Sequence, residues 1–181
     1  MNKKKELLKL IPEFDLIQDD ELRENTIAVW EEAMQYRSWT VKELYMIPFT
    51  LSAENVKMSL PEHVRTVCQI CVACDKILTE SYGERKTPVN HDHLVAGALL
   101  HDVGKLYEYD KKDGKVFKSK HGEYLRHPFS GVGLCFKHNI DEEVMHIVGV
   151  HSKEGDHFIR SPEAIILHHA DLIDFDLTRF T

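Results

Sequence analysis

The sequence predicts an all-α protein with one short β-hairpin, and three observations support this class. Several segments of the 181-residue chain carry apolar residues at the three- and four-residue spacing of a helix. Residues that favour helix N-termini, such as Ser, Asp and Asn, precede these segments. One stretch, LYEYDKKDGKVFK, instead alternates polar and apolar residues around an Asp-Gly pair typical of a hairpin turn.

Composition limits the class of function. A hydrophobic content of 43% and a charged content of 29% describe an ordinary globular chain, and 181 residues suffice for one domain with a sizeable core. The net charge of −7 disfavours binding to duplex nucleic acid, which needs a basic surface, but is compatible with a small phosphorylated substrate. We expect neither a secretory signal nor a membrane partner, because no long apolar stretch is present. Four cysteines fit a reducing compartment, so a cytoplasmic protein is expected.

The beginning of the chain predicts helices with no obvious chemistry. Asp19 or Asp20 can cap a helix over ELRENTIAVWEEAMQYR, which has a broad apolar face. Thr40 begins a second, weaker segment. A separate binding module is the alternative to a helical layer that packs on the main domain. We expect the layer, with the chain divided into an N-terminal helical extension, residues 1–55, and the main domain, residues 56–181.

A capping box marks the next helix. Ser59 stands at the N-cap position and Glu62 lies three residues later, so a helix is expected from His63 to about Leu78. Its cysteines form a CxxCxxC pattern that also occurs in iron–sulfur proteins. Helical geometry spreads three such residues over a broad arc, and no Cys-Pro follows to complete a ferredoxin motif. We therefore interpret these cysteines as core residues.

The main candidate site lies in LVAGALLHDVGKL, residues 94–106. An apolar helix here ends on His101 and Asp102, and burying such groups is costly unless they are hydrogen-bonded, ion-paired or bound to metal. Gly104 is expected to let the chain leave the helix, and Lys105 follows one turn after His101. We therefore expect His101 and Asp102 to bind metal.

A second His-Asp pair, His91-Asp92, precedes the same apolar run. There Asn90 or Asp92 can cap the helix while the other polar side chains face water. His93 lies two turns before His101 and is expected to approach the rim of the site.

Basic residues gather in and after the expected hairpin. The default interpretation is a solvated hairpin, and the alternative is a flap that brings positive charge to an anionic substrate. The 16-residue span contains Lys111, Lys112, Lys115, Lys118, Lys120 and Arg126.

Three later segments each predict a helix that carries a candidate ligand. Pro128 suits a first helical turn next to His127. Asp141 is expected to cap a helix that ends near His151, and Ser161-Pro162 to begin a last helix that carries Asp171. The residues expected to pack in that last helix are Ala164, Ile165, Leu167 and Leu172.

Six side chains at helix ends or on inward faces are therefore candidate metal ligands. The long intervals between them each fit one helix and a connection, so successive helices can deliver ligands to one centre. Four imidazoles and two carboxylates suit Fe, Mn, Co, Ni or Zn better than calcium, with Mg as a further option. The six are His63, His101, Asp102, His127, His151 and Asp171, at intervals of 38, 1, 25, 24 and 20 residues.

These residues in this order resemble the HD superfamily of metal-dependent phosphohydrolases. The resemblance rests on His63, HDVGK at 101–105, the histidines of LRHPFSG and GVHSKEG, and HHADLID, and it covers about residues 56–181. It implies an all-α bundle of at least five helices with the metals at its centre. It also implies one metal held by His63, His101, Asp102 and Asp171, with Asp102 bridging to a second metal held by His127 and His151.

The chain departs from the cyclic-dinucleotide members of that superfamily. Those members carry paired histidines where this chain has His151-Ser152, and their GYP motif is missing here. The single histidine resembles the dinuclear nucleotide hydrolases, including the diadenosine tetraphosphate hydrolases. It also resembles the small HD oxygenases, which use a mixed-valent di-iron pair.

Three functions remain open at this point. The first is a phosphomonoesterase or phosphodiesterase for a nucleotide or other small phosphate ester, in which two cations about 3.5–4 Å apart lower the pKa of a bridging water from 15.7 toward about 7. The others are a di-iron oxygenase on the same ligands and a non-catalytic module that binds a nucleotide or a protein. The expected catalytic residues are Asp102 and Lys105, and the expected substrate contacts are Lys105, Arg126, Lys120 and His168, with His169 pointing elsewhere.

Overall fold

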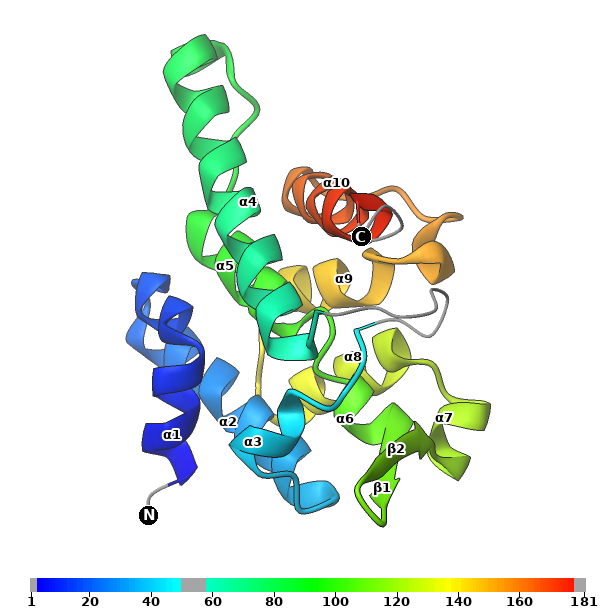
Figure 1. The fold of residues 1–181 in the computed structure, drawn as a ribbon. Coiled ribbons are helices and arrows are strands. Elements are labelled where there is room, and N and C mark those ends of the chain that lie inside the picture. The colour runs from blue at the N-terminus through cyan, green and yellow to red at the C-terminus, as the bar shows by residue number, and fades with distance from the viewer. Residues whose placement is uncertain (1–2, 50–57, 178–181) are drawn as a thin grey trace.

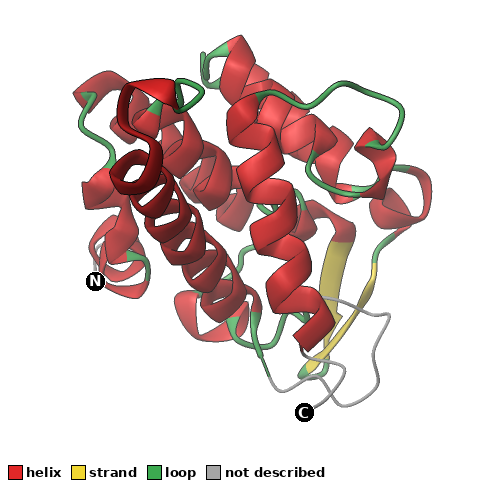
Figure 2. Cartoon of the chain, turned by 90° about the horizontal axis from the view of Figure 1, so that it is seen from above, coloured by secondary structure: helices red, strands yellow, loops and turns green. Residues whose placement is uncertain are grey.

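The computed structural model describes residues 3–49 and 58–177, and it confirms a predominantly helical fold with one hairpin (Figure 1). Seen from above, helices occupy most of the molecule and the hairpin lies at one edge (Figure 2). The elements in chain order are α1 (Lys3–Leu10), a 3₁₀ turn (Pro12–Leu16), α2 (Asp20–Tyr36), α3 (Val41–Leu44), α4 (Leu60–Tyr82), a 3₁₀ turn (Gly83–Arg85), α5 (His91–Leu100), α6 (Lys105–Glu108), β1 (Tyr109–Lys112), β2 (Lys115–Lys118), α7 (Lys120–Tyr124), α8 (His127–Lys137), α9 (Glu142–Val150), a 3₁₀ turn (Lys153–Gly155) and α10 (Pro162–Leu177).

Most helices begin at the capping residues that the sequence indicates. The Asp19 carboxylate accepts a hydrogen bond from the backbone N–H of Leu22 at the start of α2, 2.9 Å away. Thr40 and Glu43 form a capping box at α3, and the Asn90 side chain caps α5. These side chains satisfy backbone N–H groups that a helix N-terminus leaves without partners.

Helix α4 has the predicted capping box but is longer than predicted. Ser59 and Glu62 exchange the two expected hydrogen bonds, and the helix continues to Tyr82 rather than ending near Leu78. Its first half packs in the core, whereas its second half projects beyond the other helices (Figure 1). Ile77 and Tyr82 on this projecting half are exposed.

The core is built around α5. Helices α4, α9 and α10 all pack against it, and every residue from Leu94 to Leu100 is buried. In α10, Ala164 and Leu167 pack inward as predicted. The prediction for Ile165 and Leu172 was wrong, since these side chains are 47% and 38% exposed. Helix α10 is apolar on most sides, so periodicity alone did not identify its buried face.

The N-terminal helices form a layer against this bundle and share its hydrophobic core. The indole Nε1 of Trp30 in α2 donates to the carbonyl of Leu99, at 2.9 Å. The indole Nε1 of Trp39 donates to the carbonyl of Leu106, at 3.0 Å. Both indole rings are fully buried. The expected domain boundary between residues 55 and 56 lies outside the described residues.

The hairpin forms where the sequence predicts it. Strands β1 and β2 pair antiparallel, and Asp113 and Gly114 between them both have positive φ, as a two-residue hairpin turn requires. Lys111 extends from β1 to Glu43 and to the carbonyl of Ser38, so the hairpin is tied to the N-terminal layer. The short helix α7 that follows was not predicted.

Across the described residues, every helix is too short or too polar to cross a bilayer.

Candidate metal centre

The HDVGK segment turns sharply between two helices. Helix α5 ends at Leu100, and His101 and Asp102 lie in the turn that leads to α6, where both are buried. Gly104 has an ordinary φ of −61°, so the prediction that it frees the chain to leave the helix was wrong. A Cβ at this position would instead overlap the backbone carbonyl of His127. Glycine is needed here for close approach of two backbones.

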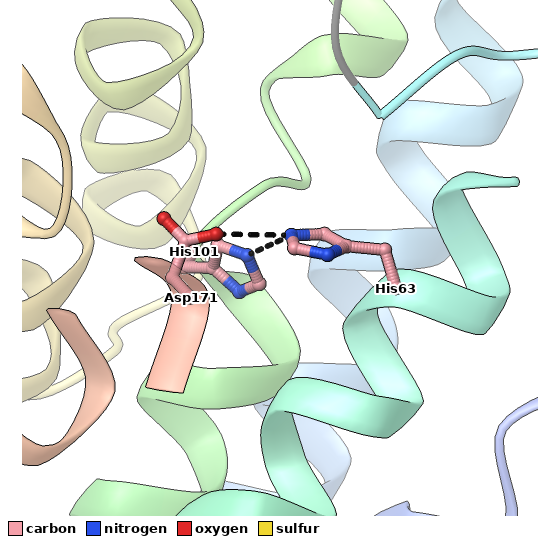
Figure 3. Close-up of side chains that lie close together, drawn as sticks. All are labelled: His63, His101 and Asp171. Carbon is pink, nitrogen blue, oxygen red and sulfur yellow. Dashed lines mark hydrogen bonds and ion pairs between the residues drawn. The ribbon is translucent and has the colours of Figure 1, made fainter. Parts of the chain in front are cut away.

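Three side chains from separate segments meet at this turn (Figure 3). His63 comes from the first turns of α4, His101 follows α5, and Asp171 comes from α10. The Nε2 atom of His63 lies 3.2 Å from Nε2 of His101 and 3.2 Å from Oδ1 of Asp171. We call these residues the first triad.

A second group of three adjoins the first triad through Asp102. The Nε2 atom of His127, from the start of α8, lies 3.3 Å from Nε2 of His151, which follows α9. It also lies 3.3 Å from Oδ1 of Asp102. Asp102, His127 and His151 form the second triad, and all three are buried.

Asp102 stands between the two triads. Its Oδ2 lies 3.4 Å from Nε2 of His63 and 3.5 Å from Nε2 of His101, while its Oδ1 faces the second triad. Each carboxylate oxygen therefore faces a different pair of histidines. The fold thus brings all six predicted ligands together around one carboxylate.

The four histidines share one orientation, with Nε2 turned to the centre and Nδ1 turned to an acceptor outside it. This arrangement places the proton on Nδ1 and leaves the Nε2 lone pair available to a metal. The acceptors are Asp174 Oδ2 for His63 (2.7 Å), the Ala98 carbonyl for His101 (2.7 Å), Glu108 Oε2 for His127 (3.0 Å) and the Val148 carbonyl for His151 (2.7 Å).

The pKa values of two histidines move in opposite directions. Burial lowers the pKa of His63, but its hydrogen bonds with Asp171 and Asp174 outweigh burial and raise the pKa to about 9. Burial and the charge of neighbouring imidazoles lower the pKa of His151 to about 3, so its ring is neutral. A neutral ring is the form that binds metal.

The comparisons with known proteins agree with this geometry. The model of the HD domain matches residues 61–176, which contain all six clustered residues. The chain belongs to the HD domain family. It is also 37% identical over 118 residues to the dihydroneopterin 2′,3′-cyclic phosphate phosphodiesterase of Methanocaldococcus jannaschii. That match covers 64% of this chain and 45% of the relative, so the chain spans about half of the relative's length. No solved structure matches the chain significantly.

A cavity of about 670 Å³ opens onto the second triad and onto Asp171 of the first triad in the HD domain. The predicted substrate contacts Lys105, Arg126 and His168 line it. Lys120 is exposed and is not among the described residues that line the cavity, whereas Lys118 of β2 is. The hairpin therefore brings one basic side chain to the cavity.

The cavity lining includes both apolar and basic side chains. Phe49, Leu172 and Phe175 form an apolar wall on the side of the first triad, where the Phe49 ring stacks on His63 at 4.5 Å between centroids. Lys118 and Arg126 also line the cavity, and Arg126 directly precedes His127 of the second triad.

Lys105 lies inside the HD site and contacts its central carboxylate. Its ammonium donates to Oδ2 of Asp102 and to the carbonyl of Phe49. Burial alone would raise the pKa of Asp102, but the charges of Lys105 and His101 hold it well below its usual range. Asp102 is therefore ionised, as a metal ligand must be.

Of the remaining histidine candidates, His168 lines the cavity, whereas His93 and His169 do not. His168 donates from Nδ1 to the carbonyl of His151, 2.6 Å away, and His169 is exposed and away from the cavity lining, as expected. The prediction for His93 was wrong, because its Nε2 faces the Asp141 carboxylate at 3.3 Å. In consequence, the Asp141 side chain forms no cap hydrogen bond at α9.

Two further predictions concern residues outside the site. The expectation that Asp92 faces water was wrong, since its carboxylate accepts from the backbone N–H groups of Gln18 and Asp19. The interpretation of the CxxCxxC pattern as core is confirmed, because Cys68 and Cys71 are buried and all four thiols are free.

Sequence reasoning missed Asp174 and Glu108, and it named Lys118 only among the basic residues of the span and not as a substrate contact. Asp174 lies three residues after Asp171 on the same helix, and this spacing was a usable signal. Glu108 reaches His127 only because α6 ends where the hairpin begins, which the sequence does not show.

Proposed function

We propose that this chain is a metal-dependent phosphohydrolase that cleaves a small organic phosphodiester. The observation that carries the proposal is the position of Asp102, whose two carboxylate oxygens face two separate histidine-rich triads. A dinuclear site of this kind suits hydrolytic attack on phosphorus. The similarity to a phosphodiesterase favours hydrolysis over oxygenation on the same ligands.

The donor atoms fit two divalent transition-metal ions. In this proposal the first triad would hold one ion, His127 and His151 would hold the other, and Asp102 would offer one carboxylate oxygen to each. Imidazole nitrogens and carboxylate oxygens suit Fe, Mn, Co, Ni or Zn, and Mg is a further option. When bound, the pair supplies Lewis acidity and lowers the pKa of water toward neutrality.

The surrounding cationic side chains bind and orient the phosphate. The Lys105 ammonium has three hydrogens, of which two contact Asp102 and the Phe49 carbonyl, so one remains for a phosphoryl oxygen. Arg126 and Lys118 stand at the cavity wall and attract the anionic substrate from solution. His168 positions the backbone at His151 through its hydrogen bond.

The cavity also suggests what the phosphate is attached to. Its apolar wall of Phe49, Leu172 and Phe175 offers aromatic faces to a planar ring. The relative from Methanocaldococcus jannaschii is named for a cyclic phosphate of dihydroneopterin. We therefore propose a cyclic phosphodiester of a heterocyclic compound, of the pterin or nucleotide type, as the substrate. A cytoplasmic location is proposed on the basis of the four free thiols.

Elemental analysis and a substrate screen test this function. The purified protein should contain up to two transition-metal ions per chain, and the loaded protein should hydrolyse bis-p-nitrophenyl phosphate and nucleoside 2′,3′-cyclic phosphates. His101→Ala is the negative control. Oxygen consumption by iron-loaded protein without ester cleavage would favour the oxygenase, and full loading without any turnover would favour a non-catalytic module.

A further inference from the structure

We propose that Asp174 and Glu108 are positioning residues that each set the metal affinity of one triad alone, Asp174 for the first and Glu108 for the second. The inference rests on the proposed dinuclear site. It assigns a separate positioning carboxylate to each half of that site.

The first positioning residue, Asp174, contacts His63, whose two ring nitrogens each face a carboxylate. Helix α10 places Asp171 and Asp174 one turn apart, and both carboxylates reach the same imidazole. Asp171 Oδ1 lies 3.2 Å from Nε2, on the side of the first triad, and Asp174 Oδ2 lies 2.7 Å from Nδ1, on the opposite side. The His63 ring is 1% exposed, so water does not replace either contact. One helix therefore fixes the orientation of this ring from both nitrogens.

The second positioning residue, Glu108, contacts His127, whose two ring nitrogens also each face a carboxylate. Asp102 Oδ1 lies 3.3 Å from Nε2, and Glu108 Oε2 lies 3.0 Å from Nδ1. Glu108 Oε2 also accepts from the backbone N–H of His127, at 3.0 Å. A Cβ at Gly122 would overlap the backbone carbonyl and the Cγ atom of Glu108, so α7 packs closely on this residue.

Helix polarity explains why only these two histidines need a carboxylate. His101 and His151 follow the C-termini of α5 and α9, where backbone carbonyls lack helical partners, and each donates to the carbonyl three residues earlier. His63 and His127 lie in the first turns of α4 and α8, where the unpaired backbone groups are N–H donors. An imidazole N–H at a helix N-terminus therefore needs an acceptor from another segment. Asp174 and Glu108 supply it.

The consequence for metal binding is local. A carboxylate behind an imidazole fixes the ring, makes Nε2 a better donor and adds negative charge near the ion. Loss of such a partner lowers metal affinity by about 10- to 100-fold. Because Asp174 contacts a ligand of one triad and Glu108 a ligand of the other, each effect should stay within its own triad.

Single-site backgrounds separate the two effects. His151→Ala leaves the first triad intact, and His101→Ala leaves the second. Asp174→Asn and Glu108→Gln are placed in each background, and Mn²⁺ affinity is measured by the electron paramagnetic resonance signal of free Mn²⁺. We expect Asp174→Asn to lower the Mn²⁺ affinity by about tenfold or more in the His151→Ala background. In the His101→Ala background the same substitution should change the Mn²⁺ affinity little. Glu108→Gln should give the reverse pattern.

Matched controls exclude a general effect of removing a carboxylate. Asp113→Asn in the hairpin turn and Glu123→Gln on α7 change exposed residues and should leave Mn²⁺ affinity unchanged in both backgrounds. Circular dichroism and the Tm of each variant report folding. If a background binds no Mn²⁺, the same comparison is made on the otherwise unaltered chain, where each variant should weaken one of two binding phases.

The outcomes also distinguish this inference from the proposed function. Equal weakening of both triads by either variant, or no weakening by either, would overturn the positioning roles while leaving the dinuclear site intact. Absence of Mn²⁺, Fe²⁺, Co²⁺ and Zn²⁺ binding by the unaltered protein would instead reject the metal site, and both proposals with it.

Discussion

Gly104 lies directly against the backbone carbonyl of His127, so the HDVGK turn and the start of α8 touch through main-chain atoms. This contact sets the distance between the Asp102 carboxylate and the His127 imidazole that faces it. We expect Gly104→Ala to lower the free energy of unfolding by about 1–3 kcal/mol or more, because neither backbone can move aside easily. Urea denaturation measures the change.

Gly133 provides the matched control for that substitution. It lies inside α8, and a Cβ there meets no described atom within 4 Å. Gly133→Ala should therefore stabilise the protein by about 0.5–1 kcal/mol through the better helix propensity of alanine. Equal stability of the two variants would show that the Gly104 contact is not restrictive.

Because Asp102 faces both pairs of histidines, its loss should lower the metal content more than the loss of a single histidine. Asp102→Ala removes the carboxylate that faces both pairs of histidines and should lose both ions and all activity, whereas His101→Ala removes a donor from the first triad alone and should lose the ion of that triad together with the activity. His151→Ala removes a donor from one triad and should retain about one ion per chain. Elemental analysis of the purified variants checks this, with circular dichroism to confirm folding. Full metal content in Asp102→Ala would contradict the proposed bridging role.

The basic residues near the hairpin should differ in their effect on substrate binding. Lys118 lines the cavity, and removal of its charge in Lys118→Ala should raise the KM for a phosphodiester about fivefold, the equivalent of about 1 kcal/mol for an exposed ion pair. Lys120→Ala is the control, because this exposed side chain lies outside the described cavity lining. The steady-state kinetics of the two variants test the placement, and a larger effect at Lys120 would refute it.

The aromatic wall predicts selectivity for substrates with a ring. Phe175→Ala should raise the KM for a nucleoside 2′,3′-cyclic phosphate by about tenfold, since stacking of a base on an aromatic side chain contributes about 1–3 kcal/mol. The KM for a small alkyl cyclic phosphodiester should change little. Phe129→Ala, on the exposed face of α8, serves as the control. Similar losses for both substrates would argue against stacking.

The cysteines should differ in their reactivity with thiol reagents. Burial raises the pKa of Cys68 and of Cys135 to about 12, and burial also raises the pKa of Cys71. Because a raised pKa reduces the thiolate fraction, these three thiols should stay protonated and unreactive at pH 8. Cys74 is only partly buried, so Ellman's reagent should modify one thiol in the native chain and four after unfolding. Loss of the native reaction in Cys74→Ser provides the control.

Much of the candidate site was predictable because its side chains lie close to helix ends. The capping box at Ser59 and Glu62, the proline after His127 and the apolar run before His101 all mark helix boundaries in the sequence. These boundaries place the imidazoles, and the length of the intervening segments allows them to meet.

The parts that could not be predicted depend on contacts between distant segments. The choice of Lys118 over Lys120 depends on α7, a helix of five residues with no clear sequence signal. His93 was expected at the site from helical spacing, but two helical turns separate it from His101 by about 12 Å along the axis, and its imidazole faces the Asp141 carboxylate instead. Gly104 looked like a helix terminator because the sequence cannot show which backbone lies opposite it.

Two indole hydrogen bonds bracket the HDVGK turn, from Trp30 to Leu99 on one side and from Trp39 to Leu106 on the other. Both tryptophans lie before residue 61, where the match to the HD domain begins. Trimming the chain to the matched segment would thus strip two buried carbonyls of their indole donors, one on each side of the turn that carries His101 and Asp102. The smallest fragment useful for expression and engineering therefore includes the N-terminal helices. The residue at which the family match begins is not the residue at which a stably folding fragment begins.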